Sequence, residues 1–143
     1  MLKGIPELIG PDLLHALHSM GHGDEIVIAD ANFPGASLTP RLIRMDGHSA
    51  TGILDAILTL MPLDDMEHAA FRMEVVEDPH KIEPIMQEFE EIIRRHQPNV
   101  SLMPIERFGF YARAKTAYAI IQSGENRLYG NILLKKGVIR PGA

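Results

Sequence analysis

A histidine bracketed by two glycines is the residue of this chain best suited to acid–base chemistry. The segment Gly21-His22-Gly23-Asp24 precedes a short apolar run that ends in the carboxylate of Asp30. Glycine neighbours allow a sharp turn around the imidazole, which titrates near neutral pH and transfers protons in either direction. Asp30 lies at the carboxyl end of a predicted strand, where α/β proteins place ligand-binding residues. The pattern also fits an exposed turn, with Gly21 ending a helix, so spacing alone leaves both interpretations open.

A second group of polar residues lies in the C-terminal third of the chain. Arg107 and Asn131 offer a guanidinium and an amide, which hydrogen-bond several hydroxyl groups in fixed geometry. Tyr129 offers a hydroxyl or a ring edge, and Gly130 allows close backbone approach to a ligand. These residue types are suited to binding a neutral polyol. The nearby aromatic residues Phe108 and Phe110 are better explained as core or interface packing.

Three histidines, His15, His18 and His22, recur at intervals that invite a metal-site interpretation. The helical wheel argues against it, because His15 and His18 project opposite the leucine face and Gly21 ends the helix before His22. The two glycines around His22 precede a strand, which is the wrong order for a dinucleotide-binding turn, and the chain lacks a G-x-S-x-G elbow. We therefore expect no metal and no cofactor.

Composition narrows the class of protein further. The 143 residues carry a net charge of −5 and include no cysteine, which excludes disulfides, a thiolate nucleophile and zinc–cysteine sites. The acidic balance argues against nucleic acid as a partner. No apolar run approaches the length of a membrane span, and the first ten residues lack the apolar region of a signal peptide. We expect a cytoplasmic protein that does not contact membranes.

Hydrophobic periodicity and turn residues predict alternating helices and strands. Helices are expected at 11–20, 49–60 (capped by Ser49), 83–96 and 109–115, and a loop at 31–40. Strands are expected at 25–30, 42–45, 71–77, 101–105, 117–122 and 131–135. This alternation favours a single α/β domain over 1–143, a three-layer sandwich in which helices flank a largely parallel sheet.

Several segments, in this order, resemble the fucose mutarotase and ribose pyranase family, and its L-fucose branch in particular. The similarity runs from about residue 2 to residue 138. The matching segments are Leu2-Lys3-Gly4-Ile5-Pro6, Met20-Gly21-His22-Gly23-Asp24-Glu25-Ile26-Val27, Ala29-Asp30-Ala31-Asn32-Phe33-Pro34, Arg44-Met45-Asp46-Gly47, Pro62-Leu63-Asp64, Ile105-Glu106-Arg107-Phe108, Phe110-Tyr111-Ala112-Arg113-Ala114-Lys115, Gly124-Glu125 and Tyr129-Gly130-Asn131-Ile132-Leu133-Leu134-Lys135-Lys136-Gly137.

The resemblance implies a ribose-pyranase-like fold and a cofactor-independent isomerase that interconverts the anomers of a free monosaccharide. It implies that His22 is the catalytic proton donor. It also implies that Asp30, Arg107 and the segment Tyr129-Gly130-Asn131 bind the sugar. Arg107 favours L-fucose, because the ribose branch has a histidine there. Two residues depart from the family pattern: Asn32 stands where some bacterial fucose enzymes have a histidine, and Met66 stands where many members have a tyrosine.

The same resemblance implies a homo-oligomer, either a ring-shaped decamer or a smaller assembly, with sites near subunit contacts. A small domain with Phe108, Phe110 and Tyr111 near its site is expected to bury some of them against a neighbour. Two alternatives remain open from the sequence. One is a D-ribose pyranase that interconverts pyranose and furanose forms, and the other is a non-catalytic sugar-binding accessory of sugar uptake.

Overall fold

Six strands form one mixed sheet in the computed structural model, which describes residues 1–142. The order across the sheet is β2-β5-β1-β6-β3-β4. The β1–β5, β2–β5 and β3–β4 pairs are parallel, whereas β6 runs antiparallel to both β1 and β3. The prediction of a largely parallel sheet is confirmed. The strands are β1 (Glu25–Ala29), β2 (Leu42–Met45), β3 (Ala70–Met73), β4 (Leu102–Ile105), β5 (Ala119–Ser123) and β6 (Ile132–Lys135).

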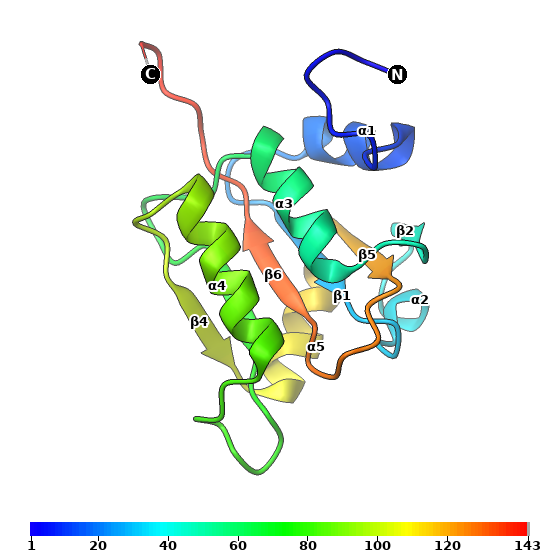
Figure 1. Ribbon diagram of the computed structural model, residues 1–143, viewed down its shortest axis with the longest axis vertical. Coiled ribbons are helices and arrows are strands. Elements are labelled where there is room, and N and C mark those ends of the chain that lie inside the picture. Colours follow the sequence, from blue (N-terminus) through cyan, green and yellow to red (C-terminus); the bar gives the residue numbers. More distant parts are fainter. Residues whose placement is uncertain (143) are drawn as a thin grey trace.

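Helices cover both faces of this sheet. In Figure 1, α3 and α4 lie side by side in front of the sheet, and α5 lies behind it. The alternation of strand side chains matches this arrangement, because Ile26 and Ile28 belong to one core, and Val27 and Ala29 to the other. The three-layer prediction is confirmed. The helices are α1 (Pro11–Ser19), α2 (Gly35–Leu38), α3 (Ala50–Leu60), α4 (Pro84–His96) and α5 (Arg107–Thr116).

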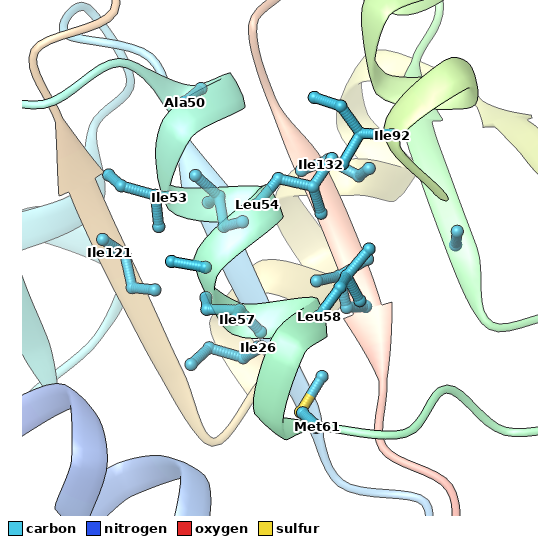
Figure 2. Packing of buried hydrophobic residues seen from close by; sticks show 14 of the residues in the cluster. Ile26, Ala50, Ile53, Leu54, Ile57, Leu58, Met61, Ile92, Ile121 and Ile132 are labelled. Atoms are coloured by element: carbon cyan, nitrogen blue, oxygen red, sulfur yellow. The ribbon is translucent and has the colours of Figure 1, made fainter. Parts of the chain in front are cut away.

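The larger core lies beneath α3 and α4. Ile53, Leu54 and Ile57 of α3 recur at helical spacing and are completely buried. Figure 2 shows them above Ile26 of β1 and Ile121 of β5. Burying one such side chain stabilises the fold by about 1.5–3 kcal/mol relative to leaving it exposed. As predicted, α3 begins after Ser49, whose hydroxyl accepts a hydrogen bond from the Gly52 amide (3.1 Å).

Two predicted segments differ from the structure. The expected loop at 31–40 contains the four-residue helix α2, which packs on β5 and α5. The strand expected at 71–77 ends at Met73, and a turn follows in which Val75 pairs with Asp78 and Glu77 has a positive φ of 66°. The strand ends there because its pairing with β4 and β6 ends at Met73 and Arg72, although Val75 and Val76 are apolar.

The helix expected to begin at Gly109 begins two residues earlier. The Glu106 carboxylate accepts hydrogen bonds from the amides of Phe108 and Gly109, both at 3.0 Å, and so caps α5. Arg107 is therefore the first residue of α5. The other predicted helices and strands are present with boundaries within two residues of those expected. Among residues 1–142, no helix has the length and apolar character needed to cross a bilayer.

Candidate functional site

The reversed direction of β6 brings Asn131 to the carboxyl end of β1, beside Asp30. The β1–β6 register pairs Ile28 with Ile132, so the residues just outside these two strands meet at one sheet edge. The Asn131 side chain accepts a hydrogen bond from the Asp30 amide (2.8 Å) and donates one to the Asp30 carboxylate (3.1 Å). Both side chains are buried. This reciprocal pair is the most constrained part of the candidate site.

The Asp30 carboxylate is held in a desolvated position. Burial raises its pKa above the ordinary value of 3.8, against the opposing effects of hydrogen bonds from the Asn32 amide and the Asn131 side chain. The Asn32 amide donates to Asp30 at 3.0 Å, and the Gln122 side chain donates to the Asp30 carbonyl at 2.6 Å. A carboxylate fixed in this way can accept a hydrogen bond from a ligand hydroxyl or exchange a proton with it.

Asp30 and Asn131 open into a pocket of about 180 Å³ at this end of the sheet. That volume is below the roughly 300 Å³ at which small-molecule pockets usually begin, so it is suited to a small ligand or to completion by another surface. An adjoining hollow of about 260 Å³ shares Val76 and Arg107 with it. The pocket is lined by Asp30, Asn32, Phe33, Met73, Val76, Arg107, Tyr111, Leu128, Tyr129 and Asn131.

Arg107 and Tyr111 reach the pocket from the first two turns of α5. They are four residues apart on the helix, so their side chains meet, and Arg107 Nε donates to the Tyr111 hydroxyl at 3.2 Å. This hydrogen bond is the main effect that raises the pKa of Arg107, which stays charged. The aromatic neighbours differ: Phe110 is buried in the core, whereas Phe108 is 68% exposed, so of the two alternatives only interface packing stays open for Phe108.

Tyr129 and Gly130 occupy the turn before β6. Tyr129 has a left-handed φ of 61°, which is costly for a residue with a side chain. Its hydroxyl accepts a hydrogen bond from the Val76 amide (3.1 Å), which leaves the hydroxyl proton free to donate. Gly130 is buried behind the pocket, where an added Cβ would come within 2.9 Å of both Ile85 and Glu125. Packing therefore requires a glycine at this position.

His22 lies at the other end of β1. It precedes this five-residue strand and Asp30 follows it, which separates the two by roughly 17 Å at about 3.3 Å per residue. Its Nε2 is 3.1 Å from Oδ1 of the buried Asp64, and its side chain is 43% exposed. The hydrogen bond from His22 is the main effect that lowers the pKa of Asp64. Within one chain, His22 and the Asp30 pocket are separate.

Three loops fix the His22–Asp64 pair. Gly23, which has a positive φ of 87°, donates its amide to the Lys136 carbonyl at 2.9 Å. The Asp64 amide donates to the Lys135 carbonyl at 3.0 Å. At Gly137 an added Cβ would come within 2.5 Å of the Leu63 carbonyl oxygen, so glycine is needed where these loops meet. The glycine that follows His22 therefore has the turn-forming role expected of it.

The metal interpretation of the histidines finds no support in the described residues. His15 and His18 are exposed on α1, on the side away from the buried Leu13 and Leu17, as the helical wheel predicted. Among residues 1–142, no cluster of three or more His, Cys, Asp or Glu side chains is arranged to hold a metal ion.

Reasoning from the residues alone did not single out Asp64 or Gln122. It named Tyr111 only as a possible packing residue, because the expected helix began at Gly109 and so did not place Arg107 and Tyr111 on one helical turn. The only sequence signal for Asp64 is its position in the segment Pro62-Leu63-Asp64. Its contact with His22 joins residues 42 positions apart, which no local pattern specifies. The two departures fall in different places: Asn32 lines the pocket, whereas the Met66 amide donates to Asp64 at 3.3 Å.

Known proteins resemble this chain over nearly its whole length. A model of the RbsD / FucU transport protein family matches residues 3–139. The human fucose mutarotase is 48% identical over 145 residues, which cover 96% of this chain and 94% of that protein. A crystal structure of the fucose mutarotase from Streptococcus pneumoniae in complex with L-fucose has a TM-score of 0.90 and 46% identity, and covers 97% of this chain and 100% of that one.

A more distant structure has the same fold. Bacillus subtilis RbsD complexed with D-ribose has a TM-score of 0.73 and covers 98% of this chain and 100% of its own. Its sequence identity is 21%, so the likeness concerns the fold and not the preferred sugar. The expected ribose-pyranase-like fold is thereby confirmed.

Proposed function

The chain belongs to the RbsD / FucU transport protein family, and on that premise we propose that it is an isomerase that interconverts the α and β anomers of L-fucose. The observation that carries the proposal is the 45–48% identity to vertebrate fucose mutarotases over 96–99% of the chain. The polar pocket around Asp30 and Asn131 supports it, because directed donors and acceptors suit a neutral sugar.

The reaction requires proton transfer, but it consumes no protons overall. A proton is delivered to the ring oxygen while another passes from the anomeric hydroxyl to water, so that the ring C–O bond breaks and an aldehyde forms; ring closure reverses both transfers. Rotation about the adjacent C–C bond and closure on the other face regenerate the hemiacetal. His22 is the proton donor in this proposal, and Asp64 accepts a hydrogen bond from its ring and orients it.

The pocket residues hold the sugar in the proposal. Asp30 and Asn131 bind hydroxyl groups from the sheet edge, while Tyr129 and Arg107 contact the sugar from the other lining segments. The Gly130 backbone holds Tyr129 and Asn131 at their spacing. Tyr111 lines the same pocket and is a further hydroxyl within reach of the sugar. Positioned acid–base groups of this kind contribute about 10²–10⁴-fold to a rate.

The separation of His22 from the pocket supports a homo-oligomer in which a neighbouring copy completes each site. Exposed apolar side chains lie beside both halves. Phe108 and Leu128 flank the pocket, at 68% and 67% exposure, and Met66 and Ile139 lie in segments near Asp64, at 72% and 76%. A head-to-tail contact that buries both surfaces would bring His22 of one copy to Asp30 of the next. Repetition of such a contact gives a ring when the rotation between neighbouring copies closes.

Saturation-transfer NMR on free L-fucose tests the function directly, because only catalysis links the α and β signals faster than spontaneous exchange. We expect rapid exchange for L-fucose with micromolar protein and without added metal or cofactor. The same measurement with D-ribose and galactose separates the sugars. Binding of L-fucose without accelerated exchange would instead indicate a sugar-binding accessory and contradict the proposal.

A further inference from the structure

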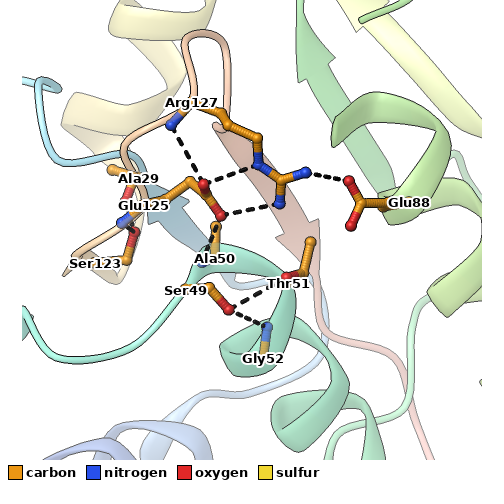
Figure 3. A network of polar contacts seen from close by, with 9 residues as sticks. All are labelled: Ala29, Ser49, Ala50, Thr51, Gly52, Glu88, Ser123, Glu125 and Arg127. Carbon is orange, nitrogen blue, oxygen red and sulfur yellow. Dashed lines mark hydrogen bonds and ion pairs between the residues drawn. The ribbon is translucent and has the colours of Figure 1, made fainter. Parts of the chain in front are cut away.

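A cluster of charged residues behind the pocket has no role in the chemistry described so far. Arg127 donates from Nε to one carboxylate oxygen of Glu125 at 3.0 Å and from a terminal nitrogen to the other at 3.3 Å. It also donates to Glu88 of α4. Figure 3 shows Arg127 between the two carboxylates. Glu125 is 4% exposed and does not line the pocket.

Glu125 contacts two of the segments that build the pocket, the turn after β1 and the turn before β6. Its carbonyl accepts a hydrogen bond from the amide of Ala31 (2.8 Å), the residue after Asp30. Its side chain packs against Gly130 so closely that a Cβ at that position would not fit. Glu125 thereby supports the turn that carries Tyr129 and Asn131. A single residue therefore touches the turn that carries the pocket carboxylate and the turn that carries the pocket amide.

The same residue is anchored to a rigid element. Its carboxylate accepts the Ala50 amide at 3.3 Å, one of the free N–H groups at the start of α3 (Figure 3). Its own amide donates to the Ser123 hydroxyl at 3.2 Å, at the end of β5. Burial opposes ionisation of Glu125, but the hydrogen bonds and the charge of Arg127, together with the Ala50 amide, outweigh it and lower its pKa, so the carboxylate stays charged and accepts from Arg127 and Ala50.

We propose that Glu125, held by Arg127, is a positioning residue that fixes the Asp30 turn and the Tyr129–Asn131 turn at the spacing the sugar requires. The inference rests on the proposed function. Its physical basis is that binding and catalysis depend steeply on placement, with a misplacement of about 1 Å costing about a hundredfold. Glu125 touches no reacting atom in this scheme and acts through the two turns.

The test compares three variants. Glu125→Gln keeps the size of the side chain but turns an –NH2 donor toward the Arg127 donors, and we expect the KM for L-fucose to rise about tenfold. Arg127→Lys keeps the charge without the two-pronged geometry, so an intermediate rise is expected. Glu88→Gln is the matched control, because Glu88 binds Arg127 but contacts neither turn; its KM and kcat should stay within about twofold of wild type.

Amide hydrogen exchange provides a readout that does not depend on activity. In Glu125→Gln we expect the Ala31 amide to exchange about tenfold faster, with Glu88→Gln unchanged. Circular dichroism confirms that each variant is folded, and Arg127→Lys serves as the milder variant if Glu125→Gln is not. The proposal would be overturned if a folded Glu125→Gln protein kept the wild-type KM and the wild-type protection of the Ala31 amide. It would also be overturned if Glu88→Gln changed both quantities as much as Glu125→Gln does. Absence of L-fucose exchange in the wild type would contradict only the proposed function.

Discussion

The imidazole Nε2 of His22 lies 3.1 Å from the carboxylate of Asp64, and the carboxylate itself is 4% exposed. A buried, ionised acceptor fixes the ring and favours the tautomer that carries a hydrogen on this nitrogen. The His22 side chain is 43% exposed, so it is accessible to another surface, whereas the Asp30 pocket lies at the other end of β1.

We expect His22→Gln to abolish accelerated anomeric exchange and Asp64→Asn to reduce it by about tenfold or more, since the ring loses its charged partner. His18→Gln is the matched control, because His18 is an exposed histidine of α1. Saturation-transfer NMR measures all three, and circular dichroism verifies the fold. Unchanged exchange in His22→Gln would remove this residue from the mechanism.

The second prediction concerns completion of the site by a neighbouring copy. His22→Gln and Asp30→Asn proteins, each inactive alone, should regain activity when they are dissociated and reassembled together. If the two variants mix at random in equal amounts in a head-to-tail ring, about a quarter of the sites contain both an intact His22 and an intact Asp30. Exchange near that fraction of wild type is the expected result. No recovery in verified mixed oligomers, or full activity in a stable monomer by sedimentation, would contradict the composite site.

The third prediction concerns the choice of sugar. Arg107 is held by Tyr111 at the pocket and offers several directed donors to hydroxyl groups. A sugar whose hydroxyl groups match these donors is bound better than one that leaves them unpaired, so the wild type should exchange L-fucose faster than D-ribose by about tenfold or more. Arg107→His should narrow that ratio. Efficient ribose interconversion by the wild type, with fucose at its spontaneous rate, would refute the fucose assignment.

The fourth prediction follows from the raised pKa of Asp30. Because burial makes the folded state hold this proton more tightly than the unfolded chain, the unfolding free energy falls as pH rises from 3.8 through the raised pKa. Above that pKa the full cost of the buried charge remains. Asp30→Asn lacks this titration. Its free energy of unfolding in urea, relative to that of the wild type, should therefore increase as pH rises. Parallel pH profiles for the two proteins would show that the carboxylate titrates as it does in the unfolded chain.

Much of the fold followed from local sequence. The apolar spacing of Ile53, Leu54 and Ile57 defines one face of a helix whatever its surroundings, and Ser49 marks its start. The apolar run before Asp30 predicted β1 in the same way. The start of α5 lies two residues before the expected one, because its cap is Glu106, which makes two hydrogen bonds here although glutamate is not among the usual N-cap residues.

The candidate site was only partly accessible to the same reasoning. The types of His22, Asp30 and Asn131 indicated proton transfer and polyol binding, because side-chain chemistry is a property of the residue itself. Their grouping was decided by tertiary structure. Reversal of β6 places Asn131 against Asp30, 101 positions away, and the length of β1 separates both from His22. Strand order and direction depend on the free energy of the whole packed sheet, which no short segment encodes.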